Sequence, residues 1–194
     1  FSVFNCLKEI TGRIEIVENA TLTAISGFAK LTKIGASISP ILARLGITTP
    51  TSIIIFNNPE LETIDGFGAL ETVDGDFWNI FNNKLESIAG FGVLETVGGV
   101  FSISSNAILA SITGFTKLET VDGVFSIFNN AKLESITGFG ALGTVDGDFS
   151  ISNNATLETI NGFGALETVT GRIEIQNNTA LTAISGFAKL TKIG

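Results

Sequence analysis

The most constraining feature of this sequence is a 24-residue unit that recurs along almost the whole chain. Its clearest copy runs from Val145 to Thr168 and reads VDGDFSISNNATLETINGFGALET. A fixed period of this length is typical of repeat proteins, in which each unit packs against its neighbours and the stack builds one continuous core. The chain is therefore expected to fold as an elongated array of coils.

Successive units begin at equivalent apolar positions, and their spacing is constant with one exception. The units start at Ile10, Ile34, Val73, Val97, Val121, Val145 and Val169. Residues 1–9 match the end of a unit, and residues 193–194 match the start of another. Residues 1–194 are thus predicted to form a single continuous array with a partial coil at either end. The exception is a step of 39 residues after Ile34, which places an insertion at residues 36–52.

The insertion, ASISPILARLGITTPTS, has local signals of its own. Pro40 suits the first turn of a helix, and Gly46 suits its end. A short helix between them would carry its apolar side chains on one face: Ile41, Leu42 and Leu45. Two interpretations stay open, a tolerated loop excursion and a protruding contact for another chain.

Within one unit the apolar pattern changes from alternate positions to every third position. Phe149 and Ile151 alternate with serine, as in a half-buried strand. From Leu157 to Val169 every third residue is apolar, which fits a chain that bends repeatedly around a core. Gly162 is expected to permit the tightest bend. One phenylalanine per unit is predicted to stack as a spine through the core: Phe28, Phe67, Phe91, Phe115, Phe139, Phe163 and Phe187.

An asparagine follows the strand in every complete unit. These side chains should form an inward ladder, because a buried turn must satisfy its backbone hydrogen bonds and an amide can do so. The predicted ladder comprises Asn19, Asn58, Asn83, Asn106, Asn130, Asn154 and Asn178. One unit departs from register: Trp78 and Ile80 are interpreted as its inward pair, displaced by a β-bulge.

The positions just after the inward strand residues should form the exposed face of the main sheet. Large apolar residues recur there, and an exposed aromatic patch is costly unless something covers it. The candidate contact face comprises Val17, Phe56, Trp78, Phe81 and Phe128. The alternative is scattered surface aromatics, which are common on proteins.

Composition argues against several classes of function. The net charge is −8, so nucleic acid is not expected as a partner, because phosphate binding needs clustered Lys and Arg. No apolar run is long enough to span a membrane. With no histidine and a single cysteine, Cys6, nucleophilic catalysis lacks its usual base. The chain is therefore predicted to be no enzyme and to need no cofactor.

Three polar columns, two of glutamate and one of threonine, are candidate binding sites. Glutamates recur in two columns and could recruit a divalent cation, but no spacing matches a calcium loop, so a solvated face is preferred. A threonine column resembles the ice-binding face of antifreeze solenoids and gives a minor alternative function. Its members are Thr72, Thr96, Thr120, Thr144 and Thr168.

Of the glycosylation sequons, only Asn177 lies outside the predicted ladder and could carry a glycan.

The constant spacing of residues within the units resembles that of leucine-rich repeats of the receptor L-domain type, which also occur in fungal cell-wall proteins. The matching positions are Leu142, Val145, Gly147, Phe149, Ile151, Asn154, Leu157, Ile160, Gly162 and Phe163. The resemblance implies a right-handed parallel β-solenoid in an extracellular or cell-surface setting. The cysteines and caps of receptor L domains are missing, which favours a long repetitive surface protein over a receptor.

A second periodicity points to a larger array. Residues 10–35 and residues 169–194 are nearly identical, so the continuation of the chain is expected to resemble the insertion after Gly35. The leading hypothesis is a non-enzymatic extracellular structural protein, a section of a larger surface or filament-forming chain, that self-associates or stacks end to end with copies of itself. The runner-up is a cell-surface binding module or adhesin that uses the exposed sheet face.

Overall fold

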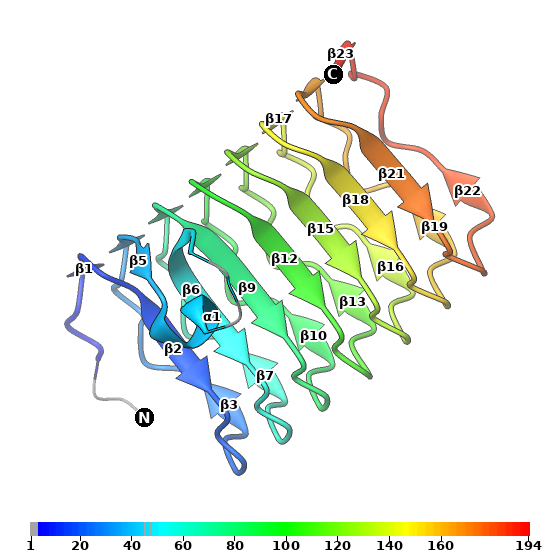
Figure 1. Ribbon diagram of the computed structural model, residues 1–194. Helices are drawn as coiled ribbons and strands as arrows, with labels where there is room; N and C mark the ends of the chain where they lie inside the picture. The colour runs from blue at the N-terminus through cyan, green and yellow to red at the C-terminus, as the bar shows by residue number, and fades with distance from the viewer. Residues whose placement is uncertain (1–3, 45, 47) are drawn as a thin grey trace.

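The computed structural model describes residues 4–44, 46 and 48–194, and it is an all-β parallel solenoid with about 24 residues per coil (Figure 1). Each coil contributes strands to three separate faces, and equivalent strands of successive coils pair side by side everywhere except at one step on one face. The predicted fold class is confirmed. The array runs without interruption through the described residues, from β1 at one end to β23 at the other.

The longest strands form one parallel sheet, called the long sheet below. Its strands, in spatial order, are β2 (Ile14–Val17), β6 (Pro50–Phe56), β9 (Asp76–Ile80), β12 (Phe101–Ser104), β15 (Phe125–Phe128), β18 (Phe149–Ser152) and β21 (Ile173–Gln176). Because side chains alternate along a strand, half of them face the core and half face outward. This outward side is visible toward the viewer in Figure 1.

Two-residue strands line the other two faces. One face carries β1 (Glu9–Ile10), β4 (Lys33–Ile34), β8 (Thr72–Val73), β11 (Thr96–Val97), β14 (Thr120–Val121), β17 (Thr144–Val145), β20 (Thr168–Val169) and β23 (Lys192–Ile193). The other carries β3 (Ala24–Ile25), β7 (Thr63–Ile64), β10 (Ser87–Ile88), β13 (Ser111–Ile112), β16 (Ser135–Ile136), β19 (Thr159–Ile160) and β22 (Ala183–Ile184). These short strands are where the three-residue apolar period turns the chain around the core.

Two phenylalanine columns fill the core. The predicted spine is confirmed and begins one ring earlier, at Phe4, with ring centroids 5.0–5.7 Å apart along the column. A second column, Phe77, Phe101, Phe125 and Phe149, stacks from the inward side of the long sheet. The columns meet edge to face, as for Phe125 and Phe139 at 5.0 Å and 89°. Offset stacking and edge-to-face contact are the favoured aromatic geometries.

An asparagine ladder closes the turn after each long strand. Asn130 shows the pattern: its backbone N–H donates to Oδ1 of Asn154 at 3.0 Å, and its Nδ2 donates to the Ile103 carbonyl at 3.0 Å. The ladder is confirmed at six of the expected positions. The prediction is wrong at Asn83, because Asn82 occupies that position in the ladder. The backbone N–H of Asn82 donates to Oδ1 of Asn106 at 3.0 Å.

The coil that begins at Val73 keeps the 24-residue register, so the predicted bulge at Trp78 is wrong. Phe77 pairs with Phe101, and Trp78 pairs with Ser102. Phe77 and Asn79 therefore face the core, while Trp78 faces outward. Buried Asn79 is accommodated because its Oδ1 accepts a hydrogen bond from Nδ2 of Asn82 at 3.1 Å. The register shift occurs one strand earlier, in β6 between Thr51 and Ile53.

The glycine expected at the tightest bend is needed for a different reason. The left-handed residue of each coil follows the long strand and is not glycine; Asn153 has φ 56°. Gly162 instead lies against the preceding coil, where a Cβ would approach the Ile136 carbonyl oxygen to 2.4 Å. At Gly162, glycine is thus required for close stacking of coils and not for a left-handed backbone; among the described glycines of this column, only Gly27 and Gly186 have positive φ.

The insertion leaves and re-enters the array at the long sheet. β5 (Ser37–Ile38) pairs antiparallel with β6, and α1 (Pro40–Ala43) follows. The expected helix begins at Pro40 but ends before Gly46. The side chains of Ile41 and Leu42, and the whole of Leu45, lie outside the described residues, so their proposed contact role stays a prediction.

Candidate functional site

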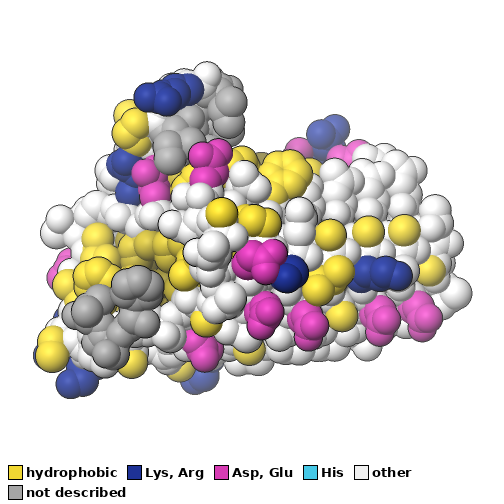
Figure 2. Space-filling view, turned by 90° about the horizontal axis from the view of Figure 1, so that it is seen from below, with side chains coloured by type: hydrophobic (Ala, Val, Ile, Leu, Met, Phe, Trp, Pro, Cys, Tyr) yellow, Lys and Arg dark blue, Asp and Glu magenta, His cyan; other side chains and the backbone are white. Residues whose placement is uncertain are grey.

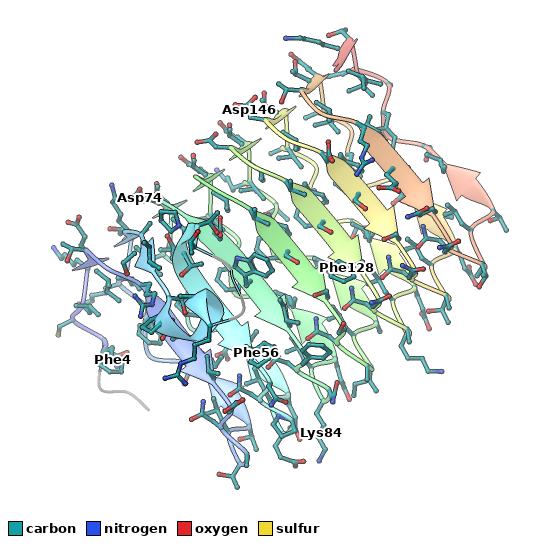
Figure 3. All side chains as sticks on the ribbon, in the orientation of Figure 1. Phe4, Phe56, Asp74, Lys84, Phe128 and Asp146 are labelled. Carbon is teal, nitrogen blue, oxygen red and sulfur yellow. The ribbon has the colours of Figure 1, made fainter. Side chains whose placement is uncertain are left out.

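The outward side of the long sheet gathers large apolar side chains on neighbouring coils. Alternation turns Ile54 and Phe56 of β6 outward, and the preserved register turns Trp78 and Ile80 of β9 outward beside them. Phe128 lies on the same side of β15. We call Phe56, Trp78, Ile80, Phe81 and Phe128 the outer patch. Figure 3 shows Phe56 and Phe128 near the same ends of their strands.

Phe81 belongs to the outer patch from a position that differs from the predicted one. It does not continue the column of Phe56, because Ile80 pairs with Phe56 across the ladder. Phe81 occupies the left-handed position after β9, with φ 58°, and is 46% exposed. Its ring meets Phe56 edge to face at 5.7 Å. Val17 precedes Phe56 in the outward column and marks the edge of the patch.

Two outward serines lie between the large side chains of the outer patch. Ser102 pairs with Trp78, and Ser104 pairs with both Ile80 and Phe128. They are only 2% and 1% exposed. Within the described part of the chain, neither hydroxyl has a hydrogen-bond partner, and neither does Nε1 of Trp78. The surface around the outer patch therefore already keeps polar atoms away from water.

Two outward columns of the long sheet are uncharged over most of their length, and the charged Asp76 at the start of β9 is buried. One outward column runs across the sheet from Glu15 on β2 to Glu174 on β21. The residues between these two glutamates are all uncharged: Ile54, Trp78, Ser102, Ser126 and Ser150. The column that contains Phe56 and Phe128 is uncharged as well. A chain of net charge −8 thus concentrates its acidic side chains elsewhere.

The acidic columns lie on the other two faces. Glu71, Glu95, Glu119 and Glu167 are exposed beside the threonine column, and Glu62, Glu86 and Glu134 are exposed on the remaining face. Figure 3 places Asp74 and Asp146 along one edge of the long sheet and Lys84 beyond the other. No group of three or more potential metal-binding side chains occurs among the residues that the structure describes. The possible divalent-cation site therefore gains no support.

The remaining candidates are single positions. The threonine column is half-buried and one residue wide, as in Thr96 paired between Thr72 and Thr120. Asn177 is exposed, whereas Asn178 beside it is buried in the ladder. Cys6 is exposed and unpaired. No helix in the described ranges is long and apolar enough to cross a membrane.

A cavity of about 220 Å³ opens at the first coil, between Phe4, Ile16, Leu22 and Phe28. Its walls are mostly apolar, with Glu15 and Asn19 at its border. It contains no pair of groups suited to nucleophilic or acid–base chemistry. The cavity lies against the apolar core at the first described coil, and we assign it no ligand.

Comparison with known proteins gives no further identification. A scan against protein-family models and searches of curated proteins and of solved structures found no match. The site is therefore argued from the geometry of the chain itself.

Proposed function

We propose that the chain is a non-enzymatic structural protein whose outer patch binds a second copy of the same chain. The observation that carries this proposal is the outer patch itself, in which Phe81 is 46% exposed and the other four side chains are partly exposed. Neighbouring large apolar residues that remain in contact with water favour a cover. Phe56, Trp78, Ile80 and Phe128 replace small or polar residues of the other coils on that one face.

Charge favours a second copy as the cover. Any approach through the two faces with glutamate columns would bring acidic side chains of both copies together and would be repulsive. On the outer face, the strands from β6 to β18 carry one charged residue, Asp76, which is 3% exposed and accepts a hydrogen bond from Thr49 Oγ1 at 2.7 Å. Figure 2 shows that the insertion projects on this side near one end of the molecule, so a second copy must meet the outer patch beside the insertion. The chain thus has one face through which copies can meet.

A cell-surface binding module or adhesin is the second candidate function. The same outer patch supports it, since aromatic residues are enriched at the centres of protein interfaces. In that case the cover is a different macromolecule, and the free chain stays monomeric. The two functions therefore make opposite predictions about self-association.

We further propose that the solenoid is of the receptor L-domain leucine-rich-repeat type and that it belongs to an extracellular or cell-surface protein. The repeat spacing and the strand-then-bend order of each coil support this. The exposed sequon asparagine, Asn177, is compatible with that location. Ice binding is not favoured, because the threonine column is flanked by glutamate.

Sedimentation velocity over a concentration series tests the proposed function. We expect reversible dimers, and we expect the double variant Trp78→Ser/Phe128→Ser to remain monomeric. Serine is the residue of the coil that begins at Val145 at both positions, so the fold should tolerate the change. Thr116→Ser, on an exposed bend, is the control.

A wild-type chain that is monomeric throughout would contradict self-association and favour the adhesin. Fibres in electron micrographs that persist in the double variant would point to end-to-end stacking.

A further inference from the structure

The insertion is held in place by an arginine and a glutamate of the preceding coil. Arg13 Nη1 donates to Ser37 Oγ at 2.9 Å and to the Ile38 carbonyl at 2.8 Å. Arg13 Nε donates to Glu15 Oε1 at 2.7 Å, and Ser39 Oγ donates to the same carboxylate. We call Arg13 and Glu15 the insertion clamp. Each clamp side chain is 20% exposed.

The electrostatics of the insertion clamp agree with its geometry. Burial by itself raises the pKa of Glu15, but the hydrogen bonds from Arg13 and Ser39 and the nearby positive charge outweigh this effect. The pKa of the carboxyl is therefore lowered, and the ionised form is the one that binds the insertion. A further contact lies on the neighbouring face, where Lys33 pairs at 2.9 Å with Asp74, which belongs to the coil after the insertion.

The last complete coil has the same residue types at the positions of Arg13, Glu15 and Lys33. Arg172, Glu174 and Lys192 stand where Arg13, Glu15 and Lys33 stand in the first complete coil. The intervening coils have different residues there; the partners of Glu15 and Glu174 in the long sheet are Ile54 and Ser150. The clamp pattern is thus confined to two coils, and in the first of them it precedes an insertion.

The two coils also share a backbone feature that the others lack. Gly27 and Gly186 have positive φ angles of 99° and 90°. The glycines at the equivalent position in the other coils, including Gly66 and Gly162, do not. The likeness therefore extends from the clamp side chains to the conformation of the coil that carries them.

The second pair is arranged differently because no insertion lies against it among the described residues. Arg172 is 73% exposed and turns back to Asp148, with Nε 3.1 Å from Oδ2. Its Nε lies 3.9 Å from Glu174 Oε2, compared with 2.7 Å in the insertion clamp. An exposed pair such as Arg172–Asp148 contributes little to stability, so breaking it costs little. Arg172 is thus free to turn toward an incoming segment.

We propose that Arg172 and Glu174 form a second clamp that binds another segment of the insertion type. The occupant has the chemistry of residues 37–40: an extended Ser-Ile-Ser strand that offers two hydroxyls and one carbonyl, followed by a proline-initiated helix. Arg172 donates to the first hydroxyl and to the carbonyl, and Glu174 accepts from the second hydroxyl. This inference does not rest on self-association through the outer patch.

The test extends the whole chain after Gly194 with a copy of residues 36–75, so that a second insertion follows the second clamp. Limited trypsin digestion then reports cleavage at the original and the copied Arg44, because the two cuts give fragments of different mass. We expect similar rates of cleavage at both sites. Arg172→Ala should speed cleavage of the copied site by at least about tenfold and leave the original site unchanged, since it removes the charge-assisted hydrogen bonds that hold the copied segment.

Lys189→Ala, on the exposed surface of the same coil, is the matched control and should change neither rate of cleavage at Arg44. Equal cleavage of the copied site with and without Arg172 would overturn the proposal, whether or not the extension folds. Arg13→Ala in the original chain gives an independent check. It should speed cleavage at the native Arg44, whose side chain is already exposed, because the released insertion opens more readily. An unchanged rate of cleavage there would show that the arginine does not hold the insertion.

Discussion

The coils from Val97 to Thr168 and those from Ile34 to Thr96 share one backbone but differ on the outside of the long sheet. The later coils place serine at most outward positions, with Phe128 as the exception. The earlier coils place Ile54, Phe56, Trp78 and Ile80 there and also carry the insertion. Inside, the same phenylalanine spine and asparagine ladder run through both regions. Shared inward positions thus maintain the solenoid, and differing outward positions create a site.

The largest expected effect is loss of core packing in the regular region. Phe125 is fully buried and touches four rings, two by stacking and two edge to face. Phe125→Ala should lower the free energy of unfolding by about 4 kcal/mol, because a large cavity remains. Phe4→Ala, at a ring that is 46% exposed with one stacking partner, should cost less than about 1 kcal/mol. Equal losses in urea denaturation would contradict the account.

A smaller effect is expected from breaking the asparagine ladder. Asn130→Ala removes donors to the Ile103 and Phe128 carbonyls and an acceptor for the Asn106 backbone N–H. Leaving these groups unpaired should lower the free energy of unfolding by about 3 kcal/mol. Asn19→Ala, in the exposed first rung, should cost about 1 kcal/mol. Thermal unfolding of the two variants measures the difference. Equal losses of stability for Asn130→Ala and Asn19→Ala would contradict a stabilising role of the buried ladder.

Restoring the repeat residue in the irregular region should stabilise the protein. Asn79 is buried where other coils place isoleucine, and its Nδ2 has no hydrogen-bond partner within the described residues. Asn79→Ile should raise the free energy of unfolding by about 1 kcal/mol, because it buries apolar surface and removes an unpaired donor. Asn82 keeps its bond to the Ile55 carbonyl. A destabilised variant would show that the Asn79–Asn82 contact is needed.

The smallest effect concerns pH and the insertion clamp. The folded pKa of Glu15 lies below its ordinary value of 4.5, so its contribution to stability is complete above that value. The contribution is lost as the pH falls through the lower folded pKa. The difference in Tm between wild type and Glu15→Gln should therefore shrink as the solution is acidified. A difference that is constant with pH would mean that ionised Glu15 does not hold the insertion.

Much of the fold follows from the repeat because its inward positions recur in every coil. The constant 24-residue step placed the coils and the spine, and the asparagine column failed at one coil only. That failure has a local cause: in Phe77-Trp78-Asn79-Ile80 the pair Trp78/Ile80 is more apolar than Phe77/Asn79. The structure keeps Phe77 and Asn79 inside because Asn82 and Leu85 hold the register that the neighbouring coils require.

The candidate site was only partly predictable for a related reason. Phe56 and Phe128 lie outward by simple alternation, but the membership of Ile80 depends on the register of β9. The strict 24-residue step was the signal that could have placed Ile80. The insertion clamp joins Arg13 to Ser37 across neighbouring coils, a contact that no local pattern indicates.

The most direct test of the central claim uses Trp78, which is the only tryptophan in the chain and lies in the outer patch. Acrylamide quenching of its fluorescence should be measured across a concentration series. If copies meet through the outer patch, quenching should fall and the emission should shift to shorter wavelength as dimers form. Dimers that leave the quenching of Trp78 unchanged would contradict the account, because the copies would then meet through another surface.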